Sequence, residues 1–244
     1  MIPSNYFLQK YIIKSLNKVL FYNETLETFL VFKVSLLYLQ SKKNYMKDLI
    51  VDKAKELFLT FGFKSVTMDH IANEMGISKK TIYNFFNNKN ELVKKVTNYM
   101  FNNITSGIKQ IKKDSVDPIS ELYDIKLFLI KYLKGEKAAP LYQLKKYYPA
   151  IHKKITVKQF EFMTNSTIDS LKNGIKLNLF RKDINTDMIS KLYFNGMIGI
   201  KDQEIFPANK YDPIFLMGNY IEYHLRAIVT KKGLKKLNQF IKKN

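Results

Sequence analysis

Residues Thr67–Phe86 read TMDHIANEMGISKKTIYNFF, a stretch that predicts two short helices joined by a tight turn. Thr67 is a good N-cap for the first helix, because its side-chain oxygen can accept a hydrogen bond from an amide of the first turn. Gly76 can adopt the positive φ that ends a helix, and Ser78 can cap the next one. This spacing predicts a helix-turn-helix.

The two predicted helices separate apolar from polar side chains. Apolar residues fall on one face of each helix and are expected to point inward: Ile71, Ala72, Met75, Ile82, Phe85 and Phe86. The opposite face of the second helix carries a cation, a phenol and two amides: Lys80, Tyr83, Asn84 and Asn87. Such side chains can contact phosphates and base edges in the major groove of DNA.

Helical patterns also flank this stretch on both sides. Residues 47–61, KDLIVDKAKELFLTF, carry apolar residues at helical spacing, and Gly62 is expected to end that helix. On the other side, Asn88 is the predicted N-cap of a long helix towards Lys113. Glu91 stands three residues after this cap, as in a capping box. The sequence thus predicts a small helical head followed by a long connecting helix.

The combined pattern resembles the TetR/AcrR family of transcriptional repressors over residues 47–95. It consists of F-G-F, then T-M-x-x-I-A-x-x-M-G-I-S-K-K-T-I-Y-x-x-F, then N-K-x-E-L-V. The resemblance implies an all-α homodimer in which three N-terminal helices bind operator DNA. One departure is His70, which stands where the family usually has an acid. The absence of that acid is expected to weaken the cap and to leave groove docking intact.

The resemblance also implies roles for individual residues. On the family's recognition helix lie the positions that match Lys79, Lys80, Thr81, Tyr83 and Asn84. Lys89 and Thr67 match positions that contact phosphates. A structural interpretation stands beside each role: Tyr83 fits a core aromatic, and the two lysines at 79 and 80 fit a solvated helix start.

Residues 104–244 are predicted to form a larger helical regulatory and dimerisation domain, after a helix-turn-helix domain at 46–103. A G-x-x-x-G-L-[FY]-R-x-D-I pattern of the family is similar to the segment from Gly174, with Asn178 where the second Gly is usual. The tail from Lys231 has six lysines and no acid, which predicts a solvated end.

The resemblance implies two further sites in this domain, each of which competes with an interpretation as plain core. Candidates for lining an effector pocket are Tyr123, Tyr142, Tyr147, Phe160, Met163 and Tyr193. In the family the last two long helices form a four-helix dimer interface. Candidates for that interface are Ile198, Phe215, Met217, Tyr220, Ile221 and Leu225.

Charge gives only weak support for a polyanionic partner. The chain of 244 residues has a formal net charge of +20, but residues 46–103 contribute +3 and residues 104–244 contribute +13. The surplus lies mainly outside the segment predicted to bind DNA, so the motif carries the hypothesis rather than the net charge.

Residues 1–45 form a predicted N-terminal extension. The hypothesis favoured by the sequence is a mis-assigned start, with the native protein beginning at Met46; an intact mass that includes residues 1–45 would contradict it. The alternatives are an arm that reaches a neighbouring groove and an amphipathic helix at a membrane surface. The apolar run Leu26–Leu39 has about 14 residues, too few to span a bilayer.

The sequence therefore predicts a cytoplasmic, ligand-responsive repressor that binds a near-palindromic operator as a dimer. It predicts no enzyme, cofactor, metal site or membrane partner: the three histidines lack ligand spacing, and the chain has no cysteine and no phosphate-binding Gly loop. The expected partners are double-stranded DNA, a second copy of the chain and an unidentified small-molecule effector. The competing hypothesis is a basic helical scaffold or membrane-surface protein without sequence-specific DNA binding.

Overall fold

The computed structural model describes residues 5–132, 139–207 and 209–241, with side chains described from Thr28 in the first helix and from Tyr142 in the sixth. Over these residues the fold is all-α, and the only extended pairing is a single bridge between Phe180 and Val229. The helices are α1 (Asn5–Phe61), α2 (Met68–Glu74), α3 (Lys79–Tyr83), α4 (Lys89–Asp114), α5 (Pro118–Tyr132), α6 (Ala139–Tyr147), α7 (Pro149–Lys176), α8 (Thr186–Gly199), α9 (Pro213–Ile228) and α10 (Lys231–Ile241). The chain divides into two units, Met1–Ile50 and Val51–Asn244.

The first unit consists of α1 up to Ile50. The helix predicted for residues 47–61 is the end of this longer helix, which begins at Asn5 and continues through Met46. Between Phe29 and Leu39, large apolar side chains are exposed on all sides of the helix, so it lacks the single apolar face of a membrane-surface helix. Over the described residues, no helix combines the length and apolar content needed to cross a bilayer.

The head packs the end of α1 against α2, α3 and the start of α4. Its buried core is apolar and contains Phe58, Ile71, Ile82, Phe86 and Leu92, each at most 1% exposed. The chain leaves α1 and α2 through residues with positive φ, Gly62 at 88° and Gly76 at 63°. Glycine suits both positions, because an L side chain is strained in this region. The predicted stop signals are therefore confirmed.

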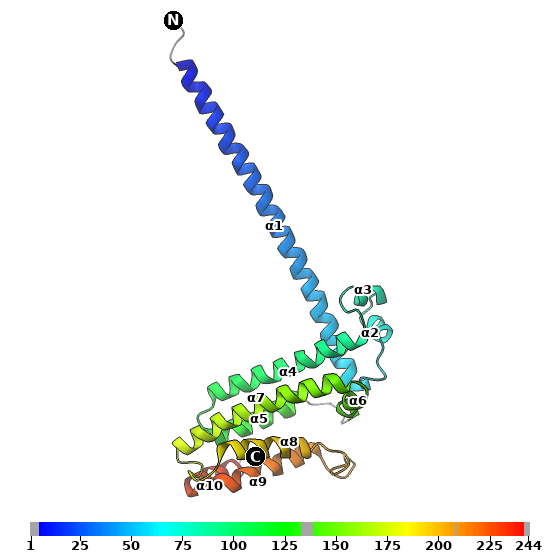
Figure 1. The fold of residues 1–244 in the computed structure, drawn as a ribbon, viewed down its shortest axis with the longest axis vertical. Helices are drawn as coiled ribbons and strands as arrows, with labels where there is room; N and C mark the ends of the chain where they lie inside the picture. Colours follow the sequence, from blue (N-terminus) through cyan, green and yellow to red (C-terminus); the bar gives the residue numbers. More distant parts are fainter. Residues whose placement is uncertain (1–4, 133–138, 208, 242–244) are drawn as a thin grey trace. The chain divides into compact units, whose positions relative to one another are not determined.

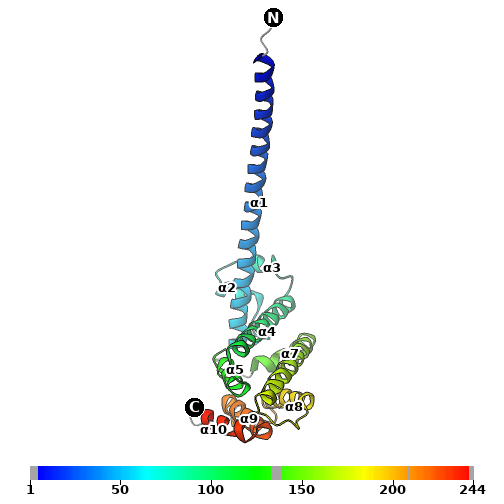
Figure 2. The ribbon, with the colours of Figure 1, turned by 90° about the vertical axis from the view of Figure 1, so that its left-hand side faces the viewer.

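The remaining helices form the larger helical domain, in which α4 packs on α5 and α7, α7 on α8, and α8 on α9. Figures 1 and 2 both show α8, α9 and α10 gathered at the end of this unit that lies away from α2 and α3. The core between α5, α7, α9 and α10 contains Ile119, Leu171, Ile221, Leu225 and Leu237. The predicted boundary between residues 103 and 104 falls inside α4.

The C-terminal tail up to residue 241 is a packed helix, not the solvated end predicted from its lysines. Leu237 of α10 is fully buried, and the Phe240 ring stacks on Tyr123 at 5.5 Å. The Lys236 ammonium lies 2.7 Å from the Asp117 carboxylate, which is itself 4% exposed. The prediction was wrong because the lysines within α10 share one side of the helix, while its apolar side closes the core over α5.

Asn178 lies between α7 and α8 with φ 57°, the left-handed conformation that its glycine counterpart in the family pattern would adopt. Asparagine is the residue that best tolerates this conformation after glycine. The backbone here is held on both sides, because the Leu179 amide donates to the Gly174 carbonyl at 2.8 Å and the Thr230 amide donates to the Leu179 carbonyl at 2.9 Å. The substitution noted in the sequence therefore preserves the turn.

Candidate nucleic-acid interface

Thr67 performs the capping role predicted for it. Its side-chain oxygen accepts a hydrogen bond from the His70 amide at 3.0 Å, and Asp69 lies in the first turn of α2. The cap is thus complete although His70 replaces the family's acid. The His70 ring instead packs against Phe61 at 5.5 Å, which joins α2 to the end of α1. Because Thr67 is exposed, its hydroxyl proton stays available to an external acceptor.

The second helix of the motif is short, because α3 ends at Tyr83 and Asn84 is its C-cap. Ser78 caps its start, where the Ser78 hydroxyl accepts from the Thr81 amide at 3.1 Å. Tyr83 is 41% exposed, which excludes the interpretation of this residue as a core aromatic. Lys80 and Asn84 are also exposed, so these three members of the predicted contact set form one accessible surface.

Two residues of the predicted set have partners within the helix-turn-helix. The Lys79 ammonium donates to the Asp69 carboxylate at 2.7 Å, and this hydrogen bond raises the pKa of Lys79. Thr81 is half-buried, and its hydroxyl lies 2.8 Å from the Ser78 hydroxyl. The Asp69 pair ties α2 to α3, so Lys79 contributes less uncompensated charge to the surface than Lys80 does.

Asn87 falls outside α3, in the turn that leads into α4, although the sequence predicted it on the same helical face as Lys80. The Asn87 amide donates to the Glu91 carboxylate at 2.9 Å, and the Glu91 amide donates to the Asn88 side chain at 2.9 Å. The predicted Asn88 cap is confirmed. In a capping box the Glu91 carboxylate would accept from the amide of the cap residue Asn88. Here it accepts from the Asn87 amide, one residue earlier.

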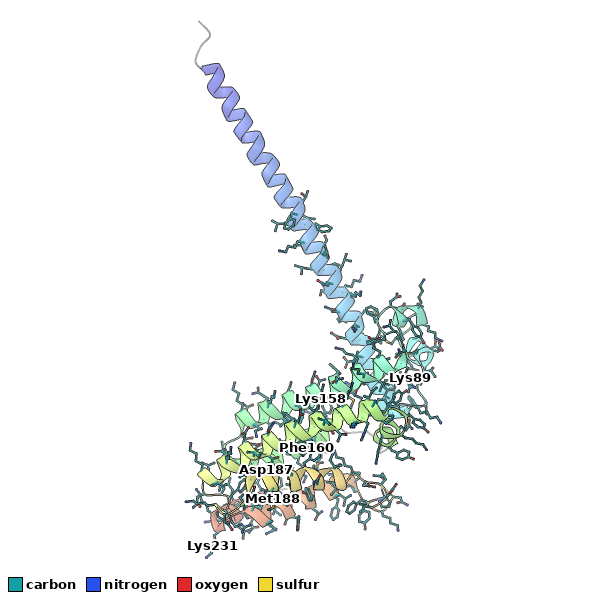
Figure 3. The ribbon with its side chains drawn as sticks, viewed as in Figure 1. Lys89, Lys158, Phe160, Asp187, Met188 and Lys231 are labelled. Atoms are coloured by element: carbon teal, nitrogen blue, oxygen red, sulfur yellow. The ribbon has the colours of Figure 1, made fainter. Side chains whose placement is uncertain are left out.

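Lys89 occupies the first turn of α4 with its ammonium turned inward. It donates to the Lys64 carbonyl at 3.1 Å and lies about 6 Å from the centre of the Tyr148 ring. Burial lowers the pKa of this amine. Figure 3 labels Lys89 at the start of α4, close to the corner between α6 and α7. Among the seven predicted contact residues, Lys89 is thus the one whose charge is held against the larger domain.

The six aromatic and sulfur residues predicted to line an effector pocket have separate surroundings. Tyr123 packs under α10, whereas Tyr193 is buried against Tyr220 and His224. The other four range from half-buried to exposed: Tyr142, Tyr147, Phe160 and Met163. Phe160 packs edge-on against Phe194 at 5.1 Å. A groove of about 500 Å³ between α4 and the α6–α7 corner is lined by Tyr147 alone of the six.

The predicted interface residues divide into core and surface. Ile221 and Leu225 are 2% and 1% exposed, so they belong to the core of the chain itself and are corrected to that role. Met217 and Tyr220 are half-buried, and the Tyr220 hydroxyl donates to the Leu192 carbonyl at 3.0 Å. Ile198 and Phe215 are exposed, at 40% and 63%.

Sequence reasoning missed four other exposed apolar residues on α8 and α9. These are Met188, which is labelled in Figure 3, Leu192, Ile214 and Tyr223. Met188 and Leu192 stand one helical turn apart, a spacing that places both on one face of α8. This i, i+4 spacing could have indicated them, but spacing alone does not show which face the core covers.

Comparison with known proteins agrees with this geometry. Residues 50–96, from the end of α1 into α4, match the model of the family described as bacterial regulatory proteins, tetR family. Over 72 residues the chain is 36% identical to the HTH-type transcriptional regulator YhgD of Bacillus subtilis, covering 30% of this chain and 36% of YhgD. Over 88 residues it is 32% identical to IcaR of Staphylococcus epidermidis, the negative transcriptional regulator of the biofilm operon icaADBC, covering 36% of this chain and 45% of IcaR.

The matches thus span less than half of the length of either relative. The fold is similar over a longer stretch. A TetR-family transcriptional regulator from Agrobacterium tumefaciens superposes with a TM-score of 0.63 at 17% identity, covering 77% of this chain and 100% of that chain. The head is therefore matched by sequence and the larger helical domain by fold. Residues 50–96 are thus similar to bacterial regulatory proteins of the tetR family, and the chain shares its fold with a TetR-family regulator.

Proposed function

We propose that this protein is a DNA-binding transcriptional regulator that acts as a homodimer. The observation that carries this proposal is the accessible surface of Lys80, Tyr83 and Asn84 on a short capped helix, within a head that matches the family model. Two such heads would place their α3 helices in successive major grooves, on half-sites about one helical turn of DNA or a multiple of it apart. A two-fold dimer implies a near-palindromic operator.

The chemistry of these side chains divides the contacts into two kinds. The Thr67 hydroxyl and the Lys80 ammonium suit phosphate oxygens, which fix the position of the head on the duplex. The Asn84 amide and the Tyr83 phenol can donate and accept, which suits base edges as well as phosphates. Lys79 and Thr81 contribute mainly by holding α3 in place, through Asp69 and Ser78 respectively.

The dimer would form through α8 and α9. Their exposed apolar side chains include Met188, Leu192, Ile198, Phe215 and Tyr223. An apolar surface rimmed by polar groups such as Asp187 and Asn219 is typical of an interface between copies. The resemblance to the family supports the same pair of helices.

Occupancy of the operator would block transcription, and a small apolar effector in the larger domain would release it. The mechanism is a population shift, in which the effector favours a spacing of the two heads that no longer fits the DNA. IcaR, a negative regulator, supports the sign of the effect. A reporter gene placed behind the operator separates repression from activation, since deletion of the regulator raises expression in the first case and lowers it in the second.

Footprinting on the DNA upstream of its own gene and of neighbouring genes tests the proposal and supplies the operator. On that operator, Tyr83→Ala is expected to weaken binding at least about tenfold, the equivalent of roughly 1.4 kcal/mol per site. Lys80→Ala is expected to reduce the slope of log K against log salt by about 0.9 for each phosphate that the Lys80 ammonium neutralises.

Lys172→Ala is the matched control, because it removes the same charge from an exposed position near the C-terminal end of α7. It should leave affinity and slope unchanged. If Lys172→Ala and Lys80→Ala lowered affinity and slope equally, the binding would be general charge attraction. That result would contradict the proposed surface. Tight binding to anionic lipid vesicles without a DNA footprint would favour the competing hypothesis of a membrane-surface protein.

A further inference from the structure

The turn between α1 and α2 is held by the corner between α6 and α7. The Lys64 amide donates to the Gln143 side chain at 2.8 Å, and the Tyr148 hydroxyl donates to the Phe63 carbonyl at 3.4 Å. The Phe63 and Tyr148 rings meet edge-on at 6.4 Å. A Cβ at Gly62 would collide with the Gln143 side chain, so the two segments are in close contact. The head is therefore joined to the larger domain through the backbone of its first turn.

Lys89 is part of the same junction. Its ammonium donates to the Lys64 carbonyl at 3.1 Å and lies within about 6 Å of the centres of the Tyr148 and Phe58 rings. The face of an aromatic ring attracts an ammonium group, and it does so more strongly where the ammonium is desolvated. These contacts restrict the Lys89 ammonium, so its reach towards a phosphate outside the protein depends on them.

A groove between the α6–α7 corner and α4 lies beside this junction and leaves room for the corner to move. The groove of about 500 Å³ is lined by Tyr147, Tyr148 and Pro149 on the corner and by Asn88 and Glu91 on α4. Tyr148 stands at the start of α7 and makes no capping hydrogen bond with its side chain. Its side chain is thus held by the Phe63 carbonyl and the neighbouring rings, not by the helix that it begins.

We propose that Tyr148 holds Lys89 in the junction, so that the position of the α6–α7 corner decides whether Lys89 is available as a phosphate contact. This inference rests on the proposed function and names a regulatory contact for it. Lys89 is then a phosphate ligand only when the corner releases it. Tyr148 is a positioning residue that acts on DNA affinity through Lys89.

The first test measures Lys89 without DNA. Brief acetylation of the intact chain, followed by mass spectrometry of its peptides, compares the reactivity of Lys89 with that of the exposed Lys80. Lys89 is expected to react several-fold more slowly in the natural protein and to approach Lys80 in Tyr148→Leu. Tyr147→Leu is the control, because the Tyr147 ring faces the Lys64 ammonium at 4.8 Å and not Lys89. Equal reactivity of Lys89 and Lys80 in the natural protein would overturn the proposal.

The second test is a double-mutant cycle on the footprinted operator, read as the slope of log K against log salt. Lys89→Met alone should leave the slope unchanged, whereas Tyr148→Leu should steepen it by about 0.9 for each released lysine. Lys89→Met in the Tyr148→Leu background should remove that increase. A shallower slope on Lys89→Met in both backgrounds would show a permanent phosphate contact, and no change in either would show a purely structural lysine; both results overturn the proposal.

The two tests separate this inference from the function beneath it. A protected Lys89 in a protein that leaves no footprint would refute the proposed function, and the phosphate role of Lys89 with it. A clear footprint with a reactive Lys89 would refute only the inference. Thermal unfolding of each variant checks that it folds. If Tyr148→Leu does not fold, the reactivity of Lys89 in the natural protein still tests the proposal.

Discussion

Lys79 and Lys80 are neighbours with the same charge, yet their surroundings give them different uses. Lys79 is paired with Asp69 at 2.7 Å, whereas Lys80 makes no ion pair with any residue that the structure describes. The charge available to a polyanion therefore depends on partners and not on the count of lysines. The same holds for Lys89, whose ammonium is held by Lys64 and Tyr148.

His224 shows how burial changes a titratable residue in the larger domain. Its ring is 9% exposed and packs against the Tyr193 ring at 4.6 Å. Burial disfavours the charged imidazolium and lowers the pKa of His224 to about 4. The folded protein therefore binds this proton more weakly than the unfolded chain does.

The first prediction at this scale concerns stability against pH. The folded pKa of His224 lies below the unfolded value near 6.5. Protonation of His224 therefore costs the protein no stability above about pH 6.5, and it lowers the free energy of unfolding as the pH drops towards 4. The expected decrease between pH 7 and pH 5 is about 2 kcal/mol. Urea unfolding of the natural protein and of His224→Gln at both pH values measures it.

In His224→Gln the free energy of unfolding should depend much less on pH between pH 7 and pH 5. His152 remains in this variant, and burial together with Lys145 lowers its pKa in the same direction, so some dependence persists. An identical decrease of stability in His224→Gln and in the natural protein would contradict the assignment to His224.

Among the elements, α10 completes the core of the larger domain. Gly233 approaches the backbone carbonyl of Leu179 so closely that a Cβ would collide with it. The Thr230 hydroxyl accepts from the Gly233 amide at 3.1 Å, and Lys236 pairs with the buried Asp117. These contacts fix the start and the middle of α10 on the rest of the domain. A segment that looks like a basic tail is therefore a structural part of the fold.

We expect Leu237→Ala to destabilise the protein by about 2–5 kcal/mol, the usual cost of truncating a fully buried leucine. Leu234, in the same helix and 37% exposed, provides the matched control. Leu234→Ala should cost less than half as much, and the free energy of unfolding in urea compares the two. Similar small effects for both would mean that α10 contributes little to the core.

At the scale of the whole molecule, the proposed DNA binding depends on two copies of the head. The exposed residues of α8 and α9 are the part of the larger domain that is proposed to join them. Of the interface residues predicted from sequence, Ile221 and Leu225 belong to the core, while the exposed Met188, Leu192 and Tyr223 are added from the surface. The same two helices remain the proposed contact.

Phe215→Glu is expected to weaken the dimer, because it would bury a charge without a partner within the proposed apolar interface. Sedimentation equilibrium should show a dissociation constant raised at least about tenfold, with DNA affinity lowered in parallel because a lone head spans one half-site. Val116→Glu, at a position 82% exposed between α4 and α5, is the control. A natural protein that sediments as a monomer while it binds its operator would contradict this arrangement.

The helix boundaries and caps of the head followed from the sequence because they depend on neighbours along the chain. Thr67, Ser78 and Asn88 each accept from an amide three residues ahead, and Gly62 and Gly76 each end a helix by their own φ. Such local interactions are encoded in spacing. The family pattern, which is also a pattern of spacing, identified the head for the same reason.

The availability of individual charges and apolar faces was decided only by tertiary structure. Lys79 meets Asp69 across the turn, Lys89 meets Tyr148 from 59 positions away, and Lys236 reaches Asp117 from the far end of the chain. The apolar face of α10 is buried only because α5 lies beside it. Helical periodicity states which residues share a face, but the packing of distant helices determines whether that face meets the core, a second copy of the chain or DNA.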